Sequence, residues 1–521
     1  MQKKNLFSSA ILTLCTLFAF TGCDQIASSL DNPVKPYLSL DKSAVELKID
    51  GTYQIVPKSI TTNPVYSYES SNPNVVAVDE NGLVTAVDYD GEATITVKVA
   101  ASEDKIYEAG ETELKVTVNT PDIETALSFE AVEDGKIIVK VVGDPKLESP
   151  IVAVTNGVKK DITEDTEIEV VEGQKVRFFG ENDHTAKNYN NNYVTILAEK
   201  KCYVYGNVMS MVTPADAEFK DNKTFTANYA LASLFYKPDG YSTKIISHPS
   251  KKLLLPATTL TDYCYDNLFN GCSSLDAAPE LPAEEMKTSC YYGMFKGCKA
   301  LTKAPELPAT TLAKDCYNQM FSDCIALTKA PELPATTLAS SCYKQMFSGC
   351  VSLTSAPALN AMEINSNCYQ QMFYGCTSLE EAPDLPALTL FNQCYGGMFY
   401  NCSALTKVPV KLPALTLASN CYNTMFYGCT SLEKAPELPA LTANVGSCYR
   451  QMFYGCTKLN YVKCLATKRN SSTYQWLEGV AATGTFIKNP SMETVTTDTN
   501  NKWILNNSKG IPSGWTIEDA D

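Results

Sequence analysis

The sequence predicts a multidomain protein: an all-β sandwich, a second β module, and then an α/β solenoid with a capping segment at each end. Residues 37–212 alternate apolar and polar side chains in short segments, which is typical of strands. A nonapeptide with two cysteines then recurs eight times, which is typical of a solenoid. With 521 residues the chain has room for several domains. Its net charge of −15 argues against a nucleic-acid partner.

The N-terminus has the features of an export signal. Lys3 and Lys4 precede the apolar run LFSSAILTLCTLFAF, which is too short and too close to the terminus to predict a membrane span. Gly22-Cys23 follows, and FTGC resembles the lipobox of bacterial lipoproteins. The resemblance implies a signal peptide at residues 1–22, a lipid on Cys23 that anchors the chain to a membrane, and a tether at residues 23–36. The alternative is a secretory signal that is cut at another site.

Residues 37–119 are predicted to form the first sandwich. In ATITVKV, Ile95 and Val97 share one face of a strand, and LKVTV repeats this alternation. Asn81-Gly82 joins two further segments, and this dipeptide predicts a hairpin with positive φ at both residues. Several short strands separated by turns predict a β-sandwich.

The stretch SSNPNVVAVDENGLVTAVDYDGEATITV resembles the bacterial Ig-like domain of group two. That family usually has Trp before its Ser-Ser-Asn, where Tyr68 is the nearest aromatic residue in this chain. Residues 37–119 contain no cysteine, so no disulfide joins the two sheets. The resemblance implies an Ig-like sandwich that acts as a spacer or, in some proteins, as an adhesive module.

Residues 124–212 are predicted to form the second β module. GKIIVKVVG and TEIEVVEGQKVRFFG alternate, and Glu172-Gly173 suits a turn between strands. His184 lies in the polar segment ENDHTAKNYNNN, where a lone histidine is usually solvated. No chemistry is recognisable in this module.

The solenoid is predicted at residues 263–466, with caps at 213–262 and 467–521. Counting the first cysteine of CYxxMFxxC as position 0, apolar residues at positions 0, 4 and 8 predict a short helix, and a recurring Gly at position 7 suits its end. A recurring Ala-Pro, as in Ala330-Pro331, predicts that the strand before it is short. Each coil is therefore expected to contain a brief strand, an extended turn and a short helix. The repeats begin at Cys264, Cys290, Cys316, Cys342, Cys368, Cys394, Cys421 and Cys448.

MFSGC followed by VSLTSAP, with LPATTLASSCY between units, resembles the BspA-like leucine-rich repeats of bacterial surface proteins. The resemblance implies a leucine-rich-repeat solenoid and a role in surface adhesion or binding. The family commonly has Ile or Val where this chain has its first cysteine, which implies that this cysteine faces the interior. Trp476, Trp503 and Trp515 all lie beyond the last repeat, as expected of a cap.

Sixteen of the 20 cysteines belong to the eight repeats. A helical nonapeptide would hold its two cysteines about 12 Å apart, whereas a disulfide needs Cα atoms within roughly 7 Å. Cys-x7-Cys also lacks the short spacing of zinc and redox motifs. Buried free thiols are therefore favoured. Disulfides, for example to a neighbouring coil, and metal or redox use remain as alternatives.

Two sets of side chains are candidate ligand-binding residues. Tyrosine occurs at position 6 only in the later repeats, where a row of rings can stack on sugars or anchor a protein partner. Charged residues are expected on the strand side, either as a solvated ladder or as a polar recognition strip. Tyrosine at position 1, as in Tyr317, is expected to pack between coils with its hydroxyl reaching solvent. The two sets are Tyr374, Tyr400, Tyr427 and Tyr454, and Lys303, Glu306, Lys329, Glu332, Lys434 and Glu437.

No catalytic residue, metal or cofactor is predicted, because His184 and His248 sit in no nucleophile motif and no GxxxxGK[ST] loop occurs. The sequence predicts a monomeric, non-catalytic binding or adhesion lipoprotein of the cell envelope. It is expected at the outer membrane, facing outward. The expected ligand is a host protein, extracellular matrix or a glycan. The alternatives are glycan capture for a polysaccharide-use system and an unrecognised hydrolase in residues 124–212.

Overall fold

The structure is a computed structural model that describes residues 34–521 apart from 62, 89, 104–105, 121–123, 157, 189–190, 215–216, 239–242, 470, 497–501 and 507–508. The chain divides into two compact units, Met1–Pro121 and Asp122–Asp521. Cys23 and the predicted signal peptide lie outside the described residues. Within the described part of the chain, no helix has the length and apolar character needed to cross a membrane.

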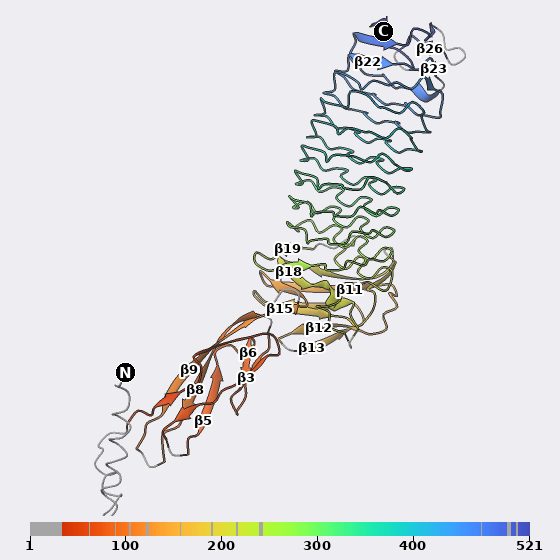
Figure 1. Ribbon diagram of the computed structural model, residues 1–521. Coiled ribbons are helices and arrows are strands. Elements are labelled where there is room, and N and C mark those ends of the chain that lie inside the picture. The colour runs from red at the N-terminus through yellow and green to blue at the C-terminus, as the bar shows by residue number, and fades with distance from the viewer. Residues whose placement is uncertain are drawn as a thin grey trace, which may run out of the picture. The chain divides into compact units, whose positions relative to one another are not determined.

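The first unit is a β-sandwich (Figure 1). Its strands are β1 Leu38–Ser39, β2 Ala44–Leu47, β3 Thr52–Gln54, β4 Lys58–Ser59, β5 Tyr66–Ser70, β6 Val76–Val78, β7 Leu83–Ala86, β8 Asp90–Val99 and β9 Gly110–Asn119. One sheet has the order β2-β9-β8-β5 and another β3-β7-β6, while β1 pairs with β4. Ile95 and Val97 are fully buried in the core of this unit, as the alternation of apolar residues predicts.

The hairpin expected at Asn81-Gly82 is present, with a different loop. β6 and β7 pair antiparallel. The Asp79 carboxylate accepts hydrogen bonds from the N–H groups of Asn81 (2.9 Å) and Leu83 (2.7 Å). Gly82 has a φ of 79°, whereas Asn81 does not have positive φ. The prediction of positive φ at both residues is therefore wrong, because Asp79 closes a longer turn through its side chain.

The second unit begins with two further sheets. Their strands are β10 Leu127–Ala131, β11 Gly135–Val142, β12 Ile151–Thr155, β13 Val158–Ile162, β14 Thr166–Val170, β15 Lys175–Phe179, β16 Ala186–Asn188, β17 Asn192–Ala198, β18 Cys202–Asn207, β19 Ile245–Ser247 and β20 Leu253–Leu254. One sheet has the order β13-β12-β15-β10-β18-β19 and the other β14-β11-β17-β16.

This β module is continuous with the solenoid. β19 and β20, which lie just before the first repeat, pair in parallel with β18. One hydrophobic cluster extends without interruption from Leu127 in the module to Trp515 near the C-terminus. Figure 1 shows the module at one end of the stacked coils. The module therefore covers the first coil and shares its core with the repeats.

The nonapeptides form chains of β-turns. In the repeat that starts at Cys316, the N–H of Asn318 bonds to the carbonyl of Asp315 (3.2 Å), three residues earlier. The N–H of the next residue, Gln319, bonds instead to Lys344 in the following coil (2.9 Å). This alternation continues along the nonapeptide, so each coil is held both by its own turns and by its neighbour.

The predicted helical part of the α/β solenoid is wrong, since the described residues contain no α-helix. Positive φ recurs at every fourth residue, at Asp315 (56°), Gln319 (58°) and Asp323 (60°). A left-handed residue interrupts a right-handed helix, and it suits the third residue of a β-turn. The apolar residues at positions 0, 4 and 8 therefore follow the period of four of these turns, not the 3.6 of a helix.

Strand pairing on the proline side of each coil is minimal. Lys329 forms single-residue bridges to Lys303 and Ser355 in the adjacent coils, because the proline two residues later cannot donate to a ladder. The last repeat has Lys463 at the proline position. There a regular strand, β22 (Tyr461–Cys464), forms and pairs with β24 (Gly484–Lys488).

An additional coil without cysteine lies at each end of the eight repeats. Leu231 donates to Cys264 of the first repeat (2.8 Å), and Tyr449 of the last repeat donates to Ser472 (3.1 Å). Beyond them, β24 pairs with β27 (Trp515–Asp519) in the C-terminal cap. The indole N–H groups of the cap donate to backbone carbonyls, in the pairs Trp476–Gly510, Trp503–Ala466 and Trp515–Ala481.

Candidate ligand-binding surface of the solenoid

The turn geometry directs five of the nine positions into the core. Side chains at positions 0, 1, 4, 5 and 8 are at most 2% exposed in all eight repeats. Aromatic rings stack from coil to coil, with centroids 5.6 Å apart for Phe295 and Phe321. The hydroxyl oxygens of Tyr265 and Tyr291 are buried without a partner, so the expectation that position-1 hydroxyls reach solvent is wrong for them. Positions 2, 3, 6 and 7 are left to form the outer surface, although four of the side chains there are buried: Asp266, Asn267, Asn318 and Ser322.

The cysteines are packing groups. All 18 in the described residues are free and buried. At position 8, each thiol donates to a backbone carbonyl of the preceding coil, as from Cys350 to Phe321 (3.1 Å) and from Cys456 to Phe426 (3.0 Å). Burial raises the pKa of the Cys290 and Cys456 thiols to about 12. The thiol form, which is the unreactive one, is therefore stabilised.

The two histidines make hydrogen bonds that do not involve one another. His248 Nδ1 accepts hydrogen bonds from the N–H groups of Ser250 (3.1 Å) and Lys251 (3.0 Å), so this nitrogen holds a turn. His184 Nδ1 contacts the neighbouring Asp183 carboxylate. Within the described part of the chain, no group of three or more His, Cys, Asp or Glu residues is arranged to hold a metal ion.

The four tyrosines at position 6 form a continuous stack. We call Tyr374, Tyr400, Tyr427 and Tyr454 the tyrosine ladder. Their ring centroids are 4.8, 4.3 and 4.8 Å apart, and successive rings are tilted by only 13°, 3° and 11°. All four rings are partly buried. Burial and the neighbouring phenols raise the pKa of Tyr400 to about 12.

The stacking changes the chemistry that the tyrosine ladder can offer. Each inner ring is covered on both faces by another tyrosine, so a ligand cannot stack on it. What remains accessible is a row of ring edges and hydroxyl groups. Such a row combines apolar contact with hydrogen bonding, as tyrosine commonly does in binding surfaces.

The six charged candidates do not form one cluster. Lys303 and Lys329 are neighbours in adjacent coils and are exposed. Lys434 belongs to the same position four coils further on, and Ser355, Glu381 and Lys407 occupy that position between them. Glu306 and Glu332 are exposed, whereas Glu437 is partly buried and pairs with Lys463 (3.2 Å). The expected strip is therefore an interrupted row of mixed charge.

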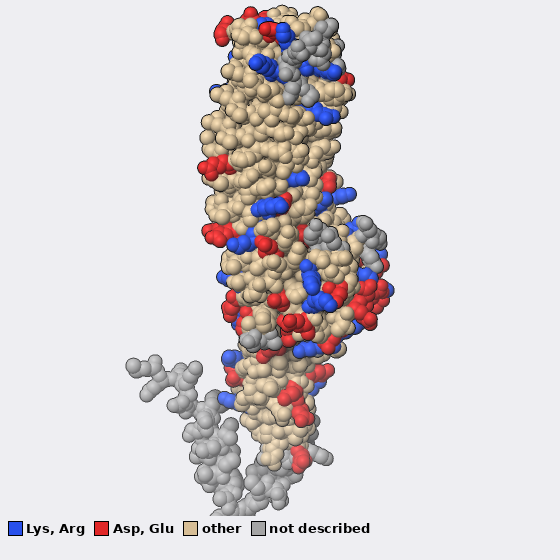
Figure 2. Space-filling model, turned by 90° about the vertical axis from the view of Figure 1, so that its right-hand side faces the viewer, with Lys and Arg blue, Asp and Glu red and all other residues tan. Residues whose placement is uncertain are grey.

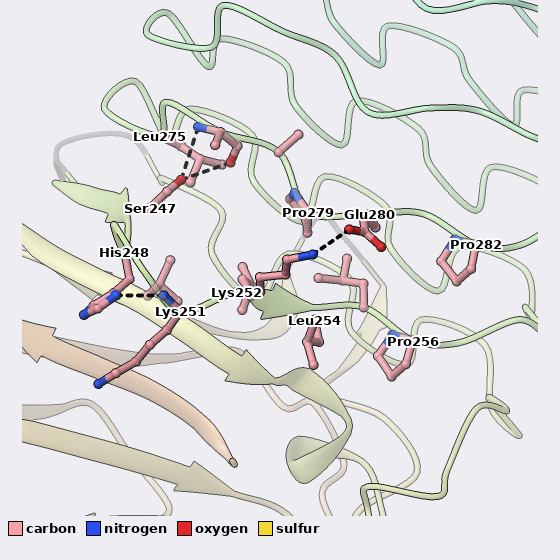
Figure 3. Close-up of a pocket in the computed structure, with 15 residues that line it drawn as sticks. Ser247, His248, Lys251, Lys252, Leu254, Pro256, Leu275, Pro279, Glu280 and Pro282 are labelled. Atoms are coloured by element: carbon pink, nitrogen blue, oxygen red, sulfur yellow. Dashed lines mark hydrogen bonds and ion pairs between the residues drawn. The ribbon is translucent and has the colours of Figure 1, made fainter. Parts of the chain in front are cut away.

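A pocket of about 340 Å³ lies where β20 meets the first repeat (Figure 3). Leu254, Pro256 and Pro279 contribute apolar walls, and Lys252 reaches across to Glu280 (3.0 Å). This pocket was not expected from the sequence. Its two sides lie in segments with no recognisable motif, and only the docking of the module on the first coil brings them together.

Charge is unevenly distributed over the second unit. On the face shown in Figure 2, charged side chains are sparse over the upper part of the solenoid and more frequent near the cap and the β module. In the sequence, every Asp, Glu, Lys and Arg between Cys368 and Tyr449 lies in three short segments: 380–384, 407–411 and 433–437. The nonapeptides that begin at Cys368, Cys394 and Cys421 are therefore uncharged.

Two regions of the chain match known families. Residues 36–109 match the bacterial Ig-like domain (group 2). Residues 251–380, 288–433 and 371–476 match the BspA type leucine rich repeat region (6 copies). A search of the curated proteins found no match to this chain.

Proposed function

Because residues 36–109 form a bacterial Ig-like group 2 domain and residues 251–476 form BspA-type leucine-rich repeats, we propose that this chain is a monomeric lipoprotein of the cell envelope that binds an extracellular ligand without catalysis. Proteins with such repeats are typically surface-associated, and both families are typically binding modules. The lipid on Cys23 would hold the protein at the outer membrane, with the solenoid facing outward.

The tyrosine ladder is the observation that carries the proposal. Core packing accounts for positions 0, 1, 4, 5 and 8, which are buried in every repeat. It does not account for four aromatic side chains at an outer position, where the four earlier repeats have Asn270, Lys296, Ser322 and Ser348. Rigid aromatic side chains on a surface are typical of binding sites.

A comparison of two variants tests which surface binds. The full chain is applied to surfaces coated with host matrix proteins or with glycans. We expect Y374S/Y400S/Y427S/Y454S to lose most of the binding, and K303S/E306S/K329S/E332S, on the charged row, to retain it. If the second variant loses binding and the first retains it, the charged row is the binding surface. Binding that neither variant changes contradicts a role for both surfaces.

The lipid anchor is tested separately by metabolic labelling with an alkyne fatty acid. We expect wild-type protein to be labelled and to sediment with outer membranes. Cys23→Ser should be neither labelled nor retained, because a single covalent site carries the acyl chains. Labelling of the Cys23→Ser protein would show that the lipobox assignment is wrong.

A further inference from the structure

The tyrosine ladder lies in the least charged part of the repeat surface. The segments 368–378, 394–404 and 421–431, which run from position 0 to position 10, contain no Asp, Glu, Lys or Arg. Each of the four earlier repeats carries at least one charge in the same stretch. These charged residues are Asp266, Lys296, Lys299, Asp323 and Lys344. Loss of charge and gain of tyrosine therefore coincide in three of the four coils of the ladder, whereas the last coil, with Tyr454, carries Arg450 and Lys458 in the same stretch.

Neutral hydrogen-bonding groups surround the ladder. At position 3, Gln371, Thr424 and Gln451 supply amides and a hydroxyl. That position adjoins position 6 of the preceding coil, because Lys296 donates to Gln319 (2.6 Å) in the equivalent place. A third row, at position 9, consists of hydroxyl-bearing side chains: Thr377, Ser403, Thr430 and Thr457. Hydroxyl and amide groups both donate and accept hydrogen bonds.

Glycine keeps one side of the ladder open. Position 7 is Gly375, Gly428 or Gly455 in three of these repeats and Asn401 in the fourth. A Cβ atom at Gly375 would have no heavy atom within 4 Å. At Gly428, by contrast, a Cβ atom would lie 2.2 Å from the Asn401 side-chain oxygen. The ladder is therefore bordered on this side by open backbone at Gly375 and by the Asn401 side chain at Gly428.

From these observations we infer that the ladder and its neutral neighbours, at positions 3, 6, 7 and 9 of the repeats that start at Cys368, Cys394, Cys421 and Cys448, bind an uncharged polysaccharide chain. The chain lies along the axis of the solenoid. The tyrosine rings, each of which carries a hydroxyl group, recur along this axis with centroids 4.3 to 4.8 Å apart. A polymer of hydroxyl-rich units can meet the same groups at each coil. This inference rests on the proposed binding function and specifies its ligand.

The absence of charge argues against the other ligand classes. A sulfated or carboxylated glycan, or a charged protein surface, would have to lose water from its ions. Over positions 0 to 10, three of these four repeats offer no counter-charge, and only the last offers Arg450 and Lys458. Removing an unpaired charge from water is strongly unfavourable. A neutral ligand does not incur this cost, and its hydroxyl groups can replace water at the rows of hydroxyls and amides.

Position 9 provides a matched pair of variants. Lys299 shows that an exposed lysine is compatible with this position. T377K/T430K places two charges beside the ladder, on exposed residues. I325K/V351K places two charges at the same position of the third and fourth repeats, where the side chains are 41% and 39% exposed. A third variant, Y374F/Y400F/Y427F/Y454F, removes the hydroxyl row and keeps the stacked rings.

The full chain is titrated calorimetrically with neutral polysaccharides (dextran, mixed-linkage β-glucan, galactomannan) and with acidic ones (hyaluronan, heparin). We expect at least one neutral polysaccharide to bind and neither acidic one to bind. T377K/T430K should weaken that binding at least tenfold, and I325K/V351K should change it less than twofold. The phenylalanine variant should also weaken the binding roughly tenfold or more, because each lost hydrogen bond lowers the affinity by a factor of a few.

The possible outcomes separate this inference from the proposed function. If only acidic polysaccharides or matrix proteins bind, the inference is wrong and the binding function stands. Neutral polysaccharide binding that T377K/T430K leaves unchanged places the site elsewhere and also overturns the inference. If no polysaccharide and no matrix protein binds, both fail. Melting temperatures of all variants within a few degrees of wild type show that a loss of binding is not a loss of fold.

Discussion

At the scale of single residues, the cysteine at position 8 combines two structural roles. It fills the core as a small apolar group, and its thiol donates to a carbonyl oxygen in the preceding coil, as from Cys350 to Phe321 (3.1 Å). The same geometry recurs in every repeat from Cys272 to Cys456. Alanine could fill part of the volume but could not donate, so cysteine meets both needs of this position.

Cys350→Ala should therefore lower the free energy of unfolding by roughly 1 to 3 kcal/mol, from a small cavity and a lost hydrogen bond. Chemical denaturation followed by intrinsic fluorescence measures the change. Thr377→Ala, at an exposed position, is the control and should change stability by no more than about 0.5 kcal/mol. Equal effects of the two substitutions would contradict the packing role of the thiol.

Asp266 is a buried acid whose ionisation affects stability. Its side chain is 1% exposed and accepts a hydrogen bond from Asn267 (2.7 Å). Burial raises the pKa of this carboxyl group to about 8. Between pH 4 and 8 the folded protein therefore holds a proton that the unfolded chain has lost, so this group's contribution to stability decreases as the pH rises.

Asp266→Asn removes this dependence. The free energy of unfolding of the variant relative to wild type should rise by at least about 1 kcal/mol between pH 5 and pH 8, since one unit of pKa corresponds to about 1.4 kcal/mol. Urea unfolding at the two pH values measures it. Asp384→Asn, at an exposed position, should show no such rise. A difference for Asp266→Asn that does not vary with pH would show that this carboxyl group is ionised in the folded protein.

At the scale of the element, the nonapeptide is a turn ladder that depends on residues able to adopt positive φ. Position 7 has positive φ in every repeat, as at Gly375 (71°) and Asn401 (58°). Gly and Asn adopt this conformation more readily than other residues. Because the turns at positions 3 and 7 close successive parts of one coil, a change at either site affects a complete coil and its bonds to both neighbours.

Gly375→Ala should lower the free energy of unfolding by about 1 to 2 kcal/mol, the cost of a left-handed residue with a Cβ. No steric contact adds to this cost, because a Cβ at Gly375 meets no atom within 4 Å. Gly375→Asn should cost less, since Asn401 occupies the same position in the next coil. Thermal unfolding of wild type and both variants measures the order of their stabilities. If asparagine is as costly as alanine, backbone conformation does not decide this position.

The sequence predicted part of this architecture. The period of 26 or 27 residues, the inward cysteines and the short strand before each proline were recognisable, because they depend on repeated local chemistry. The turn ladder was not, because an apolar residue at every fourth position suits both a turn period of four and a helix. Gln319 and Gln345 have positive φ (58° and 53°), and glutamine gives no signal for it. The Gly at position 7 was recognised as a helix end, when it marks one turn of a series.

The candidate site was predicted in the same uneven way. The tyrosine ladder was found because four tyrosines share a position in the last repeats. That its rings cover one another could not be predicted without the spacing between coils. The neutral rows at positions 3 and 9 were missed, although alignment of the repeats by position would have shown them. Glu437 was expected to belong to a continuous strip, but its pairing with Lys463 depends on the structure of the last coil.

At the scale of the whole molecule, the β module, the repeats and the C-terminal cap of the second unit share one hydrophobic core. Eight repeats contribute sixteen cysteines to this core. These cysteines are buried and pack the core. The proposed binding role therefore falls to the outer positions of the repeat, above all to the tyrosine ladder. If instead the sulfur atoms were cross-linked or metal-bound, the core would depend on redox state or on an ion.

Quantitative thiol labelling with iodoacetamide, followed by peptide mass spectrometry, distinguishes these cases. The full chain, purified without reductant, is labelled in its native state, in denaturant, and in denaturant after reduction. We expect the sixteen repeat cysteines to be protected in the native protein and fully labelled in denaturant before any reduction. Labelling that appears only after reduction would show disulfides between the coils, and rapid labelling of the native protein would show that the cysteines do not lie in a packed core.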